Sequence, residues 1–267
     1  MGISAKRLTY LEPSLSILNQ YVEGMNLVFL GKGKLAQVTM EIAQERGHQL
    51  VGVHDSAHPW VTPINKNDVD MVFEMSRPEL VHAHVLSALE QGLPMVIGTT
   101  GWYDRLPEIK EHCERLEGSV LWASNFAPGV QVFRRLGRTL AAMLDALPDF
   151  QLELHESHHL QKLDSPSGTA IQTAQDLLSS SNRYRRWLPE LSADPQTLPI
   201  ISHRLEDEVG THTLVAQSDF EHISLEHKAN HRRAFGLGAV LAAEWLKQRQ
   251  GFFTVDHYYE SLWGLCQ

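Results

Sequence analysis

The densest group of reactive side chains lies between residues 156 and 170. These residues read Glu156-Ser157-His158-His159-Leu160-Gln161-Lys162-Leu163-Asp164-Ser165-Pro166-Ser167-Gly168-Thr169-Ala170. His158, His159 and Lys162 supply proton donors near neutral pH. Residues 165–169 then open a helix that we expect near 170–178, where hydroxyls and unpaired N–H groups hold a carboxylate well. The cluster therefore predicts proton transfer beside an anion-binding cradle.

The same stretch also matches a zinc-protease pattern. Residues 155–159 read H-E-S-H-H, and H-E-x-x-H binds zinc when its two histidines lie one turn apart on a helix. Residues 150–155, however, alternate between apolar and polar side chains, which is typical of a half-exposed strand. On a strand, His155 and His159 lie two pleats apart, too far for one metal ion in the usual arrangement. We therefore predict no metal site here.

A second motif lies near the start of the chain. Gly31-Lys32-Gly33-Lys34-Leu35-Ala36 is a G-x-G-x-x-A pattern between an apolar run and an expected helix. The first glycine permits a tight turn, the second lets the backbone approach a pyrophosphate, and Ala36 allows close helix–strand packing. Asp55, 24 residues after Gly31, can accept hydrogen bonds from the adenosine ribose. We predict dinucleotide binding, although a structural turn can use the same glycines.

A third motif, Gly98-Thr99-Thr100-Gly101, follows the expected fourth strand. Ligands of parallel sheets bind at this carboxyl edge, and small residues there admit a flat ring. An ordinary strand-to-helix loop with threonine caps explains the same residues equally well.

The elements that position these motifs alternate along the first half of the chain. Short apolar runs predict strands at 27–30, 50–53, 71–73, 95–97 and 120–122, with helices at 34–46, 79–91 and 105–116 between them. This alternation predicts an α/β fold with a Rossmann-like, doubly wound parallel sheet.

After residue 127 the pattern changes. Half-exposed strands are expected at 150–155, 211–215 and 223–227, which predicts a second α+β domain with an open mixed sheet. A helix expected at 234–246 could return to the first domain. We expect a dinucleotide-binding domain at 25–126, a substrate-binding and oligomerisation domain at 127–232, and a C-terminal return at 233–267.

Composition narrows the class of protein. A net charge of -9 favours neither nucleic acid nor an anionic membrane as partner, and no apolar run is long enough to span a membrane. Cys113 and Cys266 lie far apart and are expected to be free thiols in a cytoplasmic protein. Residues 1–24 show no secretory signal, and we interpret them as an extension without assigned function.

Taken together, residues 156–170 resemble the signature of the 4-hydroxy-tetrahydrodipicolinate reductase (dihydrodipicolinate reductase) family, E-x-H-H-x-x-K-x-D-A-P-S-G-T-A. Residues 98–101 match the G-T-T-G loop of the family, and residues 123–126 resemble its interdomain cofactor segment. The likeness extends over about residues 25–260, where further matching residues fall in the order of the family: Arg204, Val209-Gly210, His212, His227-Lys228-Ala229 and Arg232.

The resemblance implies a reductase of a cyclic imine dicarboxylate in diaminopimelate and lysine synthesis, with NADH or NADPH as cofactor. It implies that His158 is the catalytic acid/base, that Lys162 is a second proton donor, and that His159, Gly168 and Thr169 contact the substrate. It also implies a homotetramer built through the sheet of the second domain. The cofactor contacts that it implies are Gly31, Lys32, Gly33, Lys34, Leu35, Ala36, Asp55, Gly98, Thr99, Thr100, Ala123, Ser124, Asn125 and Phe126.

The chain departs from the family pattern in three places. Residues 34–36 read K-L-A where R-M-G is usual, Ser56 stands where an arginine usually follows the ribose-binding acid, and Ser165 replaces an alanine. Asp55 favours a free ribose 2'-hydroxyl, and Ser56 offers no guanidinium to a 2'-phosphate. We therefore expect NADH to serve at least as well as NADPH.

Two other readings remain open. A related reductase acting on another cyclic imine or amino acid would keep the glycine-rich turn, but has little reason to keep both the His/Lys cluster and Ser167-Gly168-Thr169. A non-catalytic protein that senses nucleotides would tolerate loss of His158 or Lys162, and both are present.

Overall fold

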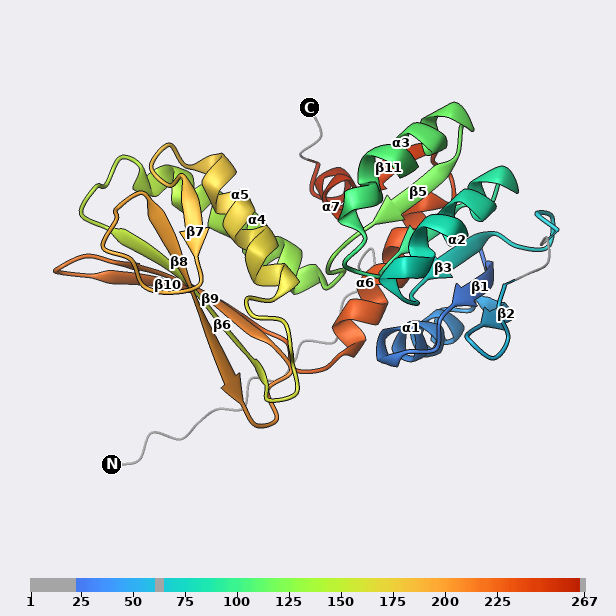
Figure 1. The fold of residues 1–267 in the computed structure, drawn as a ribbon, viewed down its shortest axis with the longest axis horizontal. Coiled ribbons are helices and arrows are strands. Elements are labelled where there is room, and N and C mark those ends of the chain that lie inside the picture. The colour runs from blue at the N-terminus through green and yellow to red at the C-terminus, as the bar shows by residue number, and fades with distance from the viewer. Residues whose placement is uncertain (1–22, 61–64, 265–267) are drawn as a thin grey trace.

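The computed structural model describes residues 23–60 and 65–264, which form two bodies joined side by side (Figure 1). All but the last two residues of the expected extension 1–24, and Cys266, lie outside these residues. Among the described helices, none is both long and apolar enough to cross a membrane.

The first body is built on a six-stranded, fully parallel sheet in the order β11-β5-β4-β3-β1-β2. Its four inner strands are short and mostly buried, as expected when helices cover both faces of a sheet, whereas its two edge strands are partly exposed. They are β1 (Asn26–Leu30), β2 (Gln49–His54), β3 (Met71–Glu74), β4 (Met95–Ile97), β5 (Ser119–Trp122) and β11 (Gly251–Thr254).

Helices lie on both faces of this sheet. Along β1, Leu27 and Phe29 face one core, which α1 (Lys34–Glu45), α6 (Arg233–Leu246) and α7 (Val255–Leu262) complete. Val28 and Leu30 face the other core, which α2 (Pro78–Glu90) and α3 (Leu106–Arg115), preceded by the short helix η2 (Tyr103–Arg105), complete. The doubly wound α/β fold is therefore confirmed.

The second body holds a five-stranded mixed sheet in the order β10-β9-β6-β8-β7. Strands β6 and β9 pair antiparallel, as do β9 and β10, whereas β8 runs parallel to both β6 and β7. The bounds are β6 (Gln151–His159), β7 (Arg186–Leu188), β8 (Thr197–Leu205), β9 (Thr211–Gln217) and β10 (His222–Lys228). The open mixed sheet is thus confirmed.

Two long helices, α4 (Pro128–Leu144) and α5 (Gly168–Ser180), cover one face of this sheet. Burial alternates strictly along β6, where Leu152, Leu154, Glu156 and His158 all face the helices. The same face is therefore apolar core at the start of the strand and polar at its end.

Candidate active site

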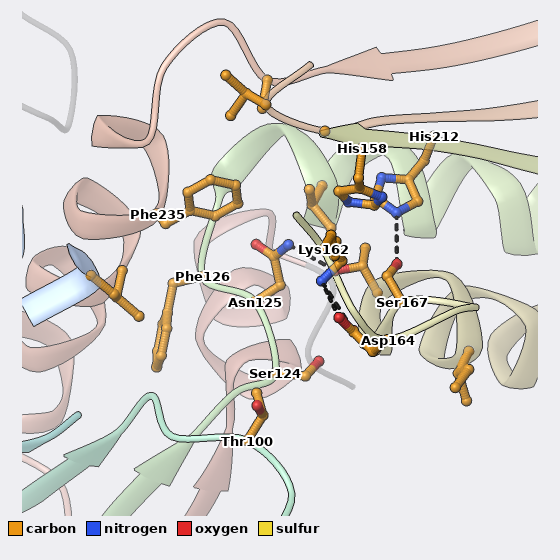
Figure 2. Close-up of a pocket in the computed structure, with 18 of the residues that line it drawn as sticks. Thr100, Ser124, Asn125, Phe126, His158, Lys162, Asp164, Ser167, His212 and Phe235 are labelled. Carbon is orange, nitrogen blue, oxygen red and sulfur yellow. Dashed lines mark hydrogen bonds and ion pairs between the residues drawn. The ribbon is translucent and has the colours of Figure 1, made fainter. Parts of the chain in front are cut away.

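A cavity of about 620 Å³ opens between the two bodies, and most of the residues singled out by sequence line it. The first body contributes Leu35, Gly98, Thr100 and residues 124–126, and the second contributes the β6–α5 cluster. Figure 2 shows Thr100, Ser124 and Phe126 on one side of this space, and His158, Lys162 and His212 on the other. The cavity has the size of a small-molecule site.

The glycine-rich turn lies where the strand order of the parallel sheet reverses. Gly31 follows β1 with a φ of +113°, and a Cβ there would come within 2.1 Å of the Met75 carbonyl, just past β3. Gly33 caps α1 in an extended conformation with no side-chain hydrogen bond, and a Cβ on it would meet nothing within 4 Å. The open turn and the uncapped helix start both fit a dinucleotide phosphate.

Asp55 lies directly after β2 and beside this turn. Its Oδ1 accepts from the backbone N–H groups of Ala57 and His58, each at 2.9 Å, while Lys32 Nζ lies 3.5 Å from Oδ2. The backbone hydrogen bond from His58, more than any other contact, lowers the pKa of Asp55, so the group is ionised at neutral pH. An ionised carboxylate at this edge can accept hydrogen bonds from a ribose.

The loop at 98–101 is anchored through the buried carboxylate of Glu74, at the end of β3. The Thr99 hydroxyl and the Ser76 hydroxyl both donate to this carboxylate, and His84 Nδ1 lies 3.0 Å from it. The Thr99 side chain is thus turned into the protein, whereas Gly98 and Thr100 line the cavity. Thr99 braces the loop, a role that the sequence pattern did not reveal.

The segment at 123–126 connects the two bodies. Ala123 is buried, while Ser124, Asn125 and Phe126 line the cavity. Asn125 Nδ2 donates to Thr169 Oγ1 at 3.0 Å. An expected cofactor residue and an expected substrate residue are therefore in direct contact.

His158 lies at the inner face of β6 with an exposed fraction of only 7%. Its Nδ1 is buried without a hydrogen-bond partner, 3.5 Å from Glu156 Oε2, which leaves Nε2 as the ring nitrogen available to the cavity. The ring of His212, from β9, meets it edge-on at 5.3 Å between centroids. His159, the next residue and the last of β6, is less buried, lines the rim of the same cavity and lies 3.4 Å from an Arg232 nitrogen.

Lys162 lies in the turn that follows β6. Its Nζ is 2.8 Å from an Asp164 oxygen, and the turn is held in place by Arg204, which donates to the carbonyls of Lys162 and Asp164 at 3.3 and 2.6 Å. Burial raises the pKa of Asp164, but the Lys162 hydrogen bond and charge outweigh it and the pKa is lowered. Lys162 lines the same cavity as His158, and its charge contributes to lowering the pKa of the His158 ring.

The start of α5 closes the cavity opposite the first body. Ser167 caps the helix and accepts a hydrogen bond from Ala170 N, while Gly168 and Thr169 form the first turn at the cavity wall. A Cβ at Gly168 would meet nothing within 4 Å, so the wall is open there. This arrangement is suited to binding a carboxylate.

Three histidines of the cavity, His158, His212 and His227, have lowered pKa values. Burial lowers the pKa of His158 to about 4, although the Glu156 charge acts in the opposite direction, and burial lowers the pKa of His212 to about 3. Burial likewise lowers the pKa of His227, at the end of β10. At neutral pH the positive charge facing the cavity thus comes from Lys162 and from the nearby arginines.

One group could hold a metal ion by distance alone. Donor atoms of Glu156, His158 and His212 all lie within 4.8 Å of one another. However, the Glu156 carboxylate already accepts from Ser167 N and Ser202 Oγ, and an Arg204 nitrogen lies 3.5 Å away. A guanidinium beside the ligands repels a second cation, so these contacts favour a proton site over a metal site.

The cavity also contains residues that the motifs did not reveal. Tyr103 and Phe235 line it from η2 and α6, and Glu74 braces it from behind. Phe235 lies only in an apolar helix pattern, and Glu74 directly follows a buried apolar run. A charged residue at the end of such a run is the one sequence signal that could have identified Glu74.

Two family models match consecutive parts of the chain. Residues 25–126 match the N-terminal part of dihydrodipicolinate reductase, and residues 129–258 match its C-terminal part. A 4-hydroxy-tetrahydrodipicolinate reductase from Christiangramia forsetii is 38% identical over 234 residues, which is 86% of this chain and 96% of that protein. One from Natronomonas pharaonis is 35% identical over 84% of this chain and 96% of its own length.

The fold has a counterpart among solved structures. A dipicolinate-bound dihydrodipicolinate reductase from Paenisporosarcina sp. TG-14 superposes with a TM-score of 0.70, at 21% identity, over 88% of this chain and 99% of that chain. Both the sequence matches and the architecture agree with the resemblance first seen in residues 156–170. The chain belongs to the dihydrodipicolinate reductase family of oxidoreductases.

Proposed function

We propose that the protein reduces 4-hydroxy-tetrahydrodipicolinate to tetrahydrodipicolinate with NADH or NADPH, as a step of diaminopimelate and lysine synthesis. The single observation that carries this proposal is the shared cavity, in which the dinucleotide edge of one body faces the His158–Lys162 cluster of the other. The substrate named in its relatives is a small dicarboxylate, which suits this cavity.

The dinucleotide supplies a hydride when it is bound at the parallel sheet. Gly31 and Gly33 would hold its phosphates, Asp55 its adenosine ribose, and Gly98 and Thr100 its nicotinamide ring. Ser124, Asn125 and Phe126 would position that ring towards the second body. Each of these residues lies at the carboxyl edge of the sheet, where ligands of such folds bind.

The second body would bind the substrate and supply the proton. Gly168 and Thr169 would bind one carboxylate at the start of α5, and His159 the substrate rim. The 4-hydroxyl group leaves as water, and a hydride and a proton then reduce the conjugated imine ring that remains. Lys162 would stabilise the electron density that the hydride adds to this ring, and His158 would transfer the proton through Nε2. Because His158 is neutral in the free protein, it must gain its proton when the negatively charged substrate arrives.

The direct test follows the absorbance of the reduced nicotinamide cofactor after addition of freshly generated cyclic imine. Steady oxidation of NADH or NADPH that depends on the imine supports the proposal. No oxidation with either cofactor, from protein that still binds the dinucleotide, contradicts it and favours the nucleotide-sensing alternative.

Three further parts of the proposal concern the whole protein. We assign cofactor binding to residues 25–126 with the return from 233, and substrate binding to 127–232. The mixed sheet leaves the face opposite α4 and α5 uncovered in the described chain, which supports assembly into a homotetramer through that face. Use of NADH or NADPH supports a cytoplasmic location. Light scattering on the purified protein tests the tetramer.

A further inference from the structure

One buried carboxylate lies within contact distance of several residues of the second body at or behind the cavity wall. Glu156 lies on β6 with an exposed fraction of 1%. Both its oxygens accept from Ser167 N at 3.1 Å, and Oε1 accepts from Ser202 Oγ at 2.7 Å. His158 Nδ1 and His212 Nε2 lie 3.5 and 3.7 Å from Oε2. A carboxylate with this many partners is held in one place.

We propose that Glu156 is a positioning residue that couples binding of the substrate carboxylate at the start of α5 to protonation of His158. This inference rests on the proposed function, since it names how the same site would work. Glu156 itself touches neither the cavity nor the reacting atoms, because it is almost fully buried behind His158.

The first half of the coupling is the contact with α5. Ser167 is the cap of that helix, and its N–H is bound by Glu156. Gly168 and Thr169, which would hold the carboxylate, follow directly. A substrate carboxylate that shifts this turn on binding therefore also shifts the Glu156 carboxylate.

The second half is the contact with His158. Its Nδ1 is buried and faces only the Glu156 oxygen, so the tautomer with hydrogen on Nδ1 is favoured and Nε2 faces the cavity. At 3.5 Å this is an ion-pair distance, longer than a hydrogen bond. Such contacts are often loose in free enzymes and tighten when the ligand binds.

The other charged groups around the His158 ring are of both signs. Lys162 from the turn after β6, Arg204 from β8, and the His212 and His227 rings from β9 and β10 all face this region, as does Asp164. Among these, the charges of Lys162 and Arg204 lower the pKa of His158, while those of Glu156 and Asp164 raise it. Asp164 is already paired with Lys162, which leaves Glu156 as the partner that favours the His158 cation.

The sheet also provides a matched control. Glu153 lies on the same strand but on the opposite face, and it pairs with a histidine too, His155 Nε2 at 2.9 Å. Glu153→Gln therefore makes the same chemical change to the same kind of pair, outside the cavity. It should leave activity and its pH profile as in the wild type, and light scattering checks that assembly through this outer face is also unchanged.

The experiment compares Glu156→Gln with Glu153→Gln. Glutamine keeps an oxygen for Ser167 N but removes the charge, so KM for the imine should change by less than about threefold, while kcat falls about tenfold or more. The high-pH limb of the kcat profile should move down by about one pH unit, because the His158 cation has lost its partner. Glu156→Ala removes both roles and should also raise KM.

Nuclear magnetic resonance gives a readout that does not depend on turnover. We expect the ¹⁵N signals of His158 to show hydrogen on Nδ1 in the free wild type. They should move towards the cation when dipicolinate and the reduced dinucleotide are added, and remain neutral in Glu156→Gln.

The outcomes separate the inference from the proposed function. An unchanged pH profile in Glu156→Gln, or hydrogen on Nε2 of His158 in the free wild type, overturns the coupling. The second result needs no variant, so it holds even where Glu156→Gln fails to fold. A wild type that gains the His158 proton with dipicolinate but never reduces the imine would instead contradict the proposed function and leave the coupling standing.

Discussion

At the scale of single residues, the sequence indicated which side chains meet but not what holds them. The alternation of residues 150–155 predicted the strand, and that strand places His158 inside and His155 outside. The alternation could not reveal that Glu156 is a common partner of Ser202 and His212. These two residues lie 46 and 56 positions further along the chain and approach Glu156 only because β6 pairs with β8 and β9. Contacts across a sheet are set by strand order, which a local pattern does not encode.

The roles of His158 and Lys162 can be separated from cofactor binding. We expect His158→Gln and Lys162→Met each to lower kcat about a hundredfold, because each removes a proton donor or a cation from one transition state. The double change should cost less than the product of the two. Dissociation constants for NADH, measured by fluorescence, should stay within a few-fold, since the glycine-rich turn lies on the other body. Lys110→Met, on the surface, is the control and should keep the wild-type kcat. A near-normal kcat in His158→Gln or Lys162→Met would reject these roles.

Cofactor choice should depend on Asp55. Its carboxylate repels a 2'-phosphate, while Lys32, 3.5 Å away, offsets part of that repulsion. We expect wild-type kcat/KM for NADH to be at least equal to that for NADPH. Asp55→Asn should shift the ratio towards NADPH, because the amide loses the charge and keeps an oxygen for the N–H groups of Ala57 and His58. A wild type that strongly favours NADPH, or an unchanged ratio in the variant, would disprove this assignment.

At the scale of elements, the buried parallel strands and most helices were predicted within a few residues, but α4, β7, β8, β11 and α7 were not. In β8, Pro199 interrupts the pattern of a strand, yet it lies next to the short β7 rather than in the middle of the sheet. In α4, the buried face includes Gln131 and Arg134, which no apolar periodicity detects. Arg134 is tolerated there because Asp176 on α5 and Asp256 on α7 neutralise it.

Helix α6 can pack against the 123–126 segment only because of one glycine. A Cβ at Gly238 would come within 1.8 Å of the Phe126 carbonyl oxygen, whereas a Cβ at Gly137 on α4 would meet the flexible end of Leu214, at 2.7 Å. Gly238→Ala should therefore lower the free energy of unfolding by about 2 kcal/mol or more. Gly137→Ala, which gains the same helix propensity, should change it by about 1 kcal/mol at most. Urea denaturation of both variants checks this, and equal stabilities would show that α6 can shift.

At the scale of the whole molecule, the two bodies enclose one cavity between them and are joined by two chain crossings and by side-chain contacts. The chain crosses between them near 126–128 and again near 228–233, and Asn125 reaches across to Thr169. Arg134 adds an ionic link between the second body and α7 of the first. Figure 1 shows α6 between the two sheets, beside the first of these crossings. Small rotations about these links would open or narrow the cavity.

The neutral histidines of the cavity should make the whole protein sensitive to acid. In the folded protein the pKa is lowered from 6.5 to about 4 for His158 and to about 3 for His212. As the pH falls, each of these histidines therefore takes up a proton in the unfolded chain at a higher pH than in the folded protein. Stability is therefore complete above pH 6.5 and is lost as the pH falls towards these values, by up to about 1.4 kcal/mol per pH unit for each excluded proton. Paired carboxylates such as Glu156 lose their contribution only below their ordinary pKa of 4.5.

Melting temperatures between pH 7 and pH 5 isolate this contribution. We expect a clear decrease over that range for the wild type, and a shallower one for His212→Gln, whose buried side chain takes up no proton. His58→Gln, at an exposed position, should follow the wild type. A flat wild-type profile would mean that the cavity histidines accept protons without loss of structure.

The strict alternation of β6 has a consequence for how this gene product can vary. His158 and His159 are neighbours in sequence but lie on opposite sides of the strand, so they are not two copies of one function. Loss or gain of a single residue at the start of β6, before Leu152, would exchange them, and would also turn Glu156 outward and expose Leu152 and Leu154. Substitutions on the outer face of β6 leave this order intact, whereas a one-codon insertion or deletion would remove the core and the proton donor together. Natural and engineered variation in β6 should therefore consist of replacements alone.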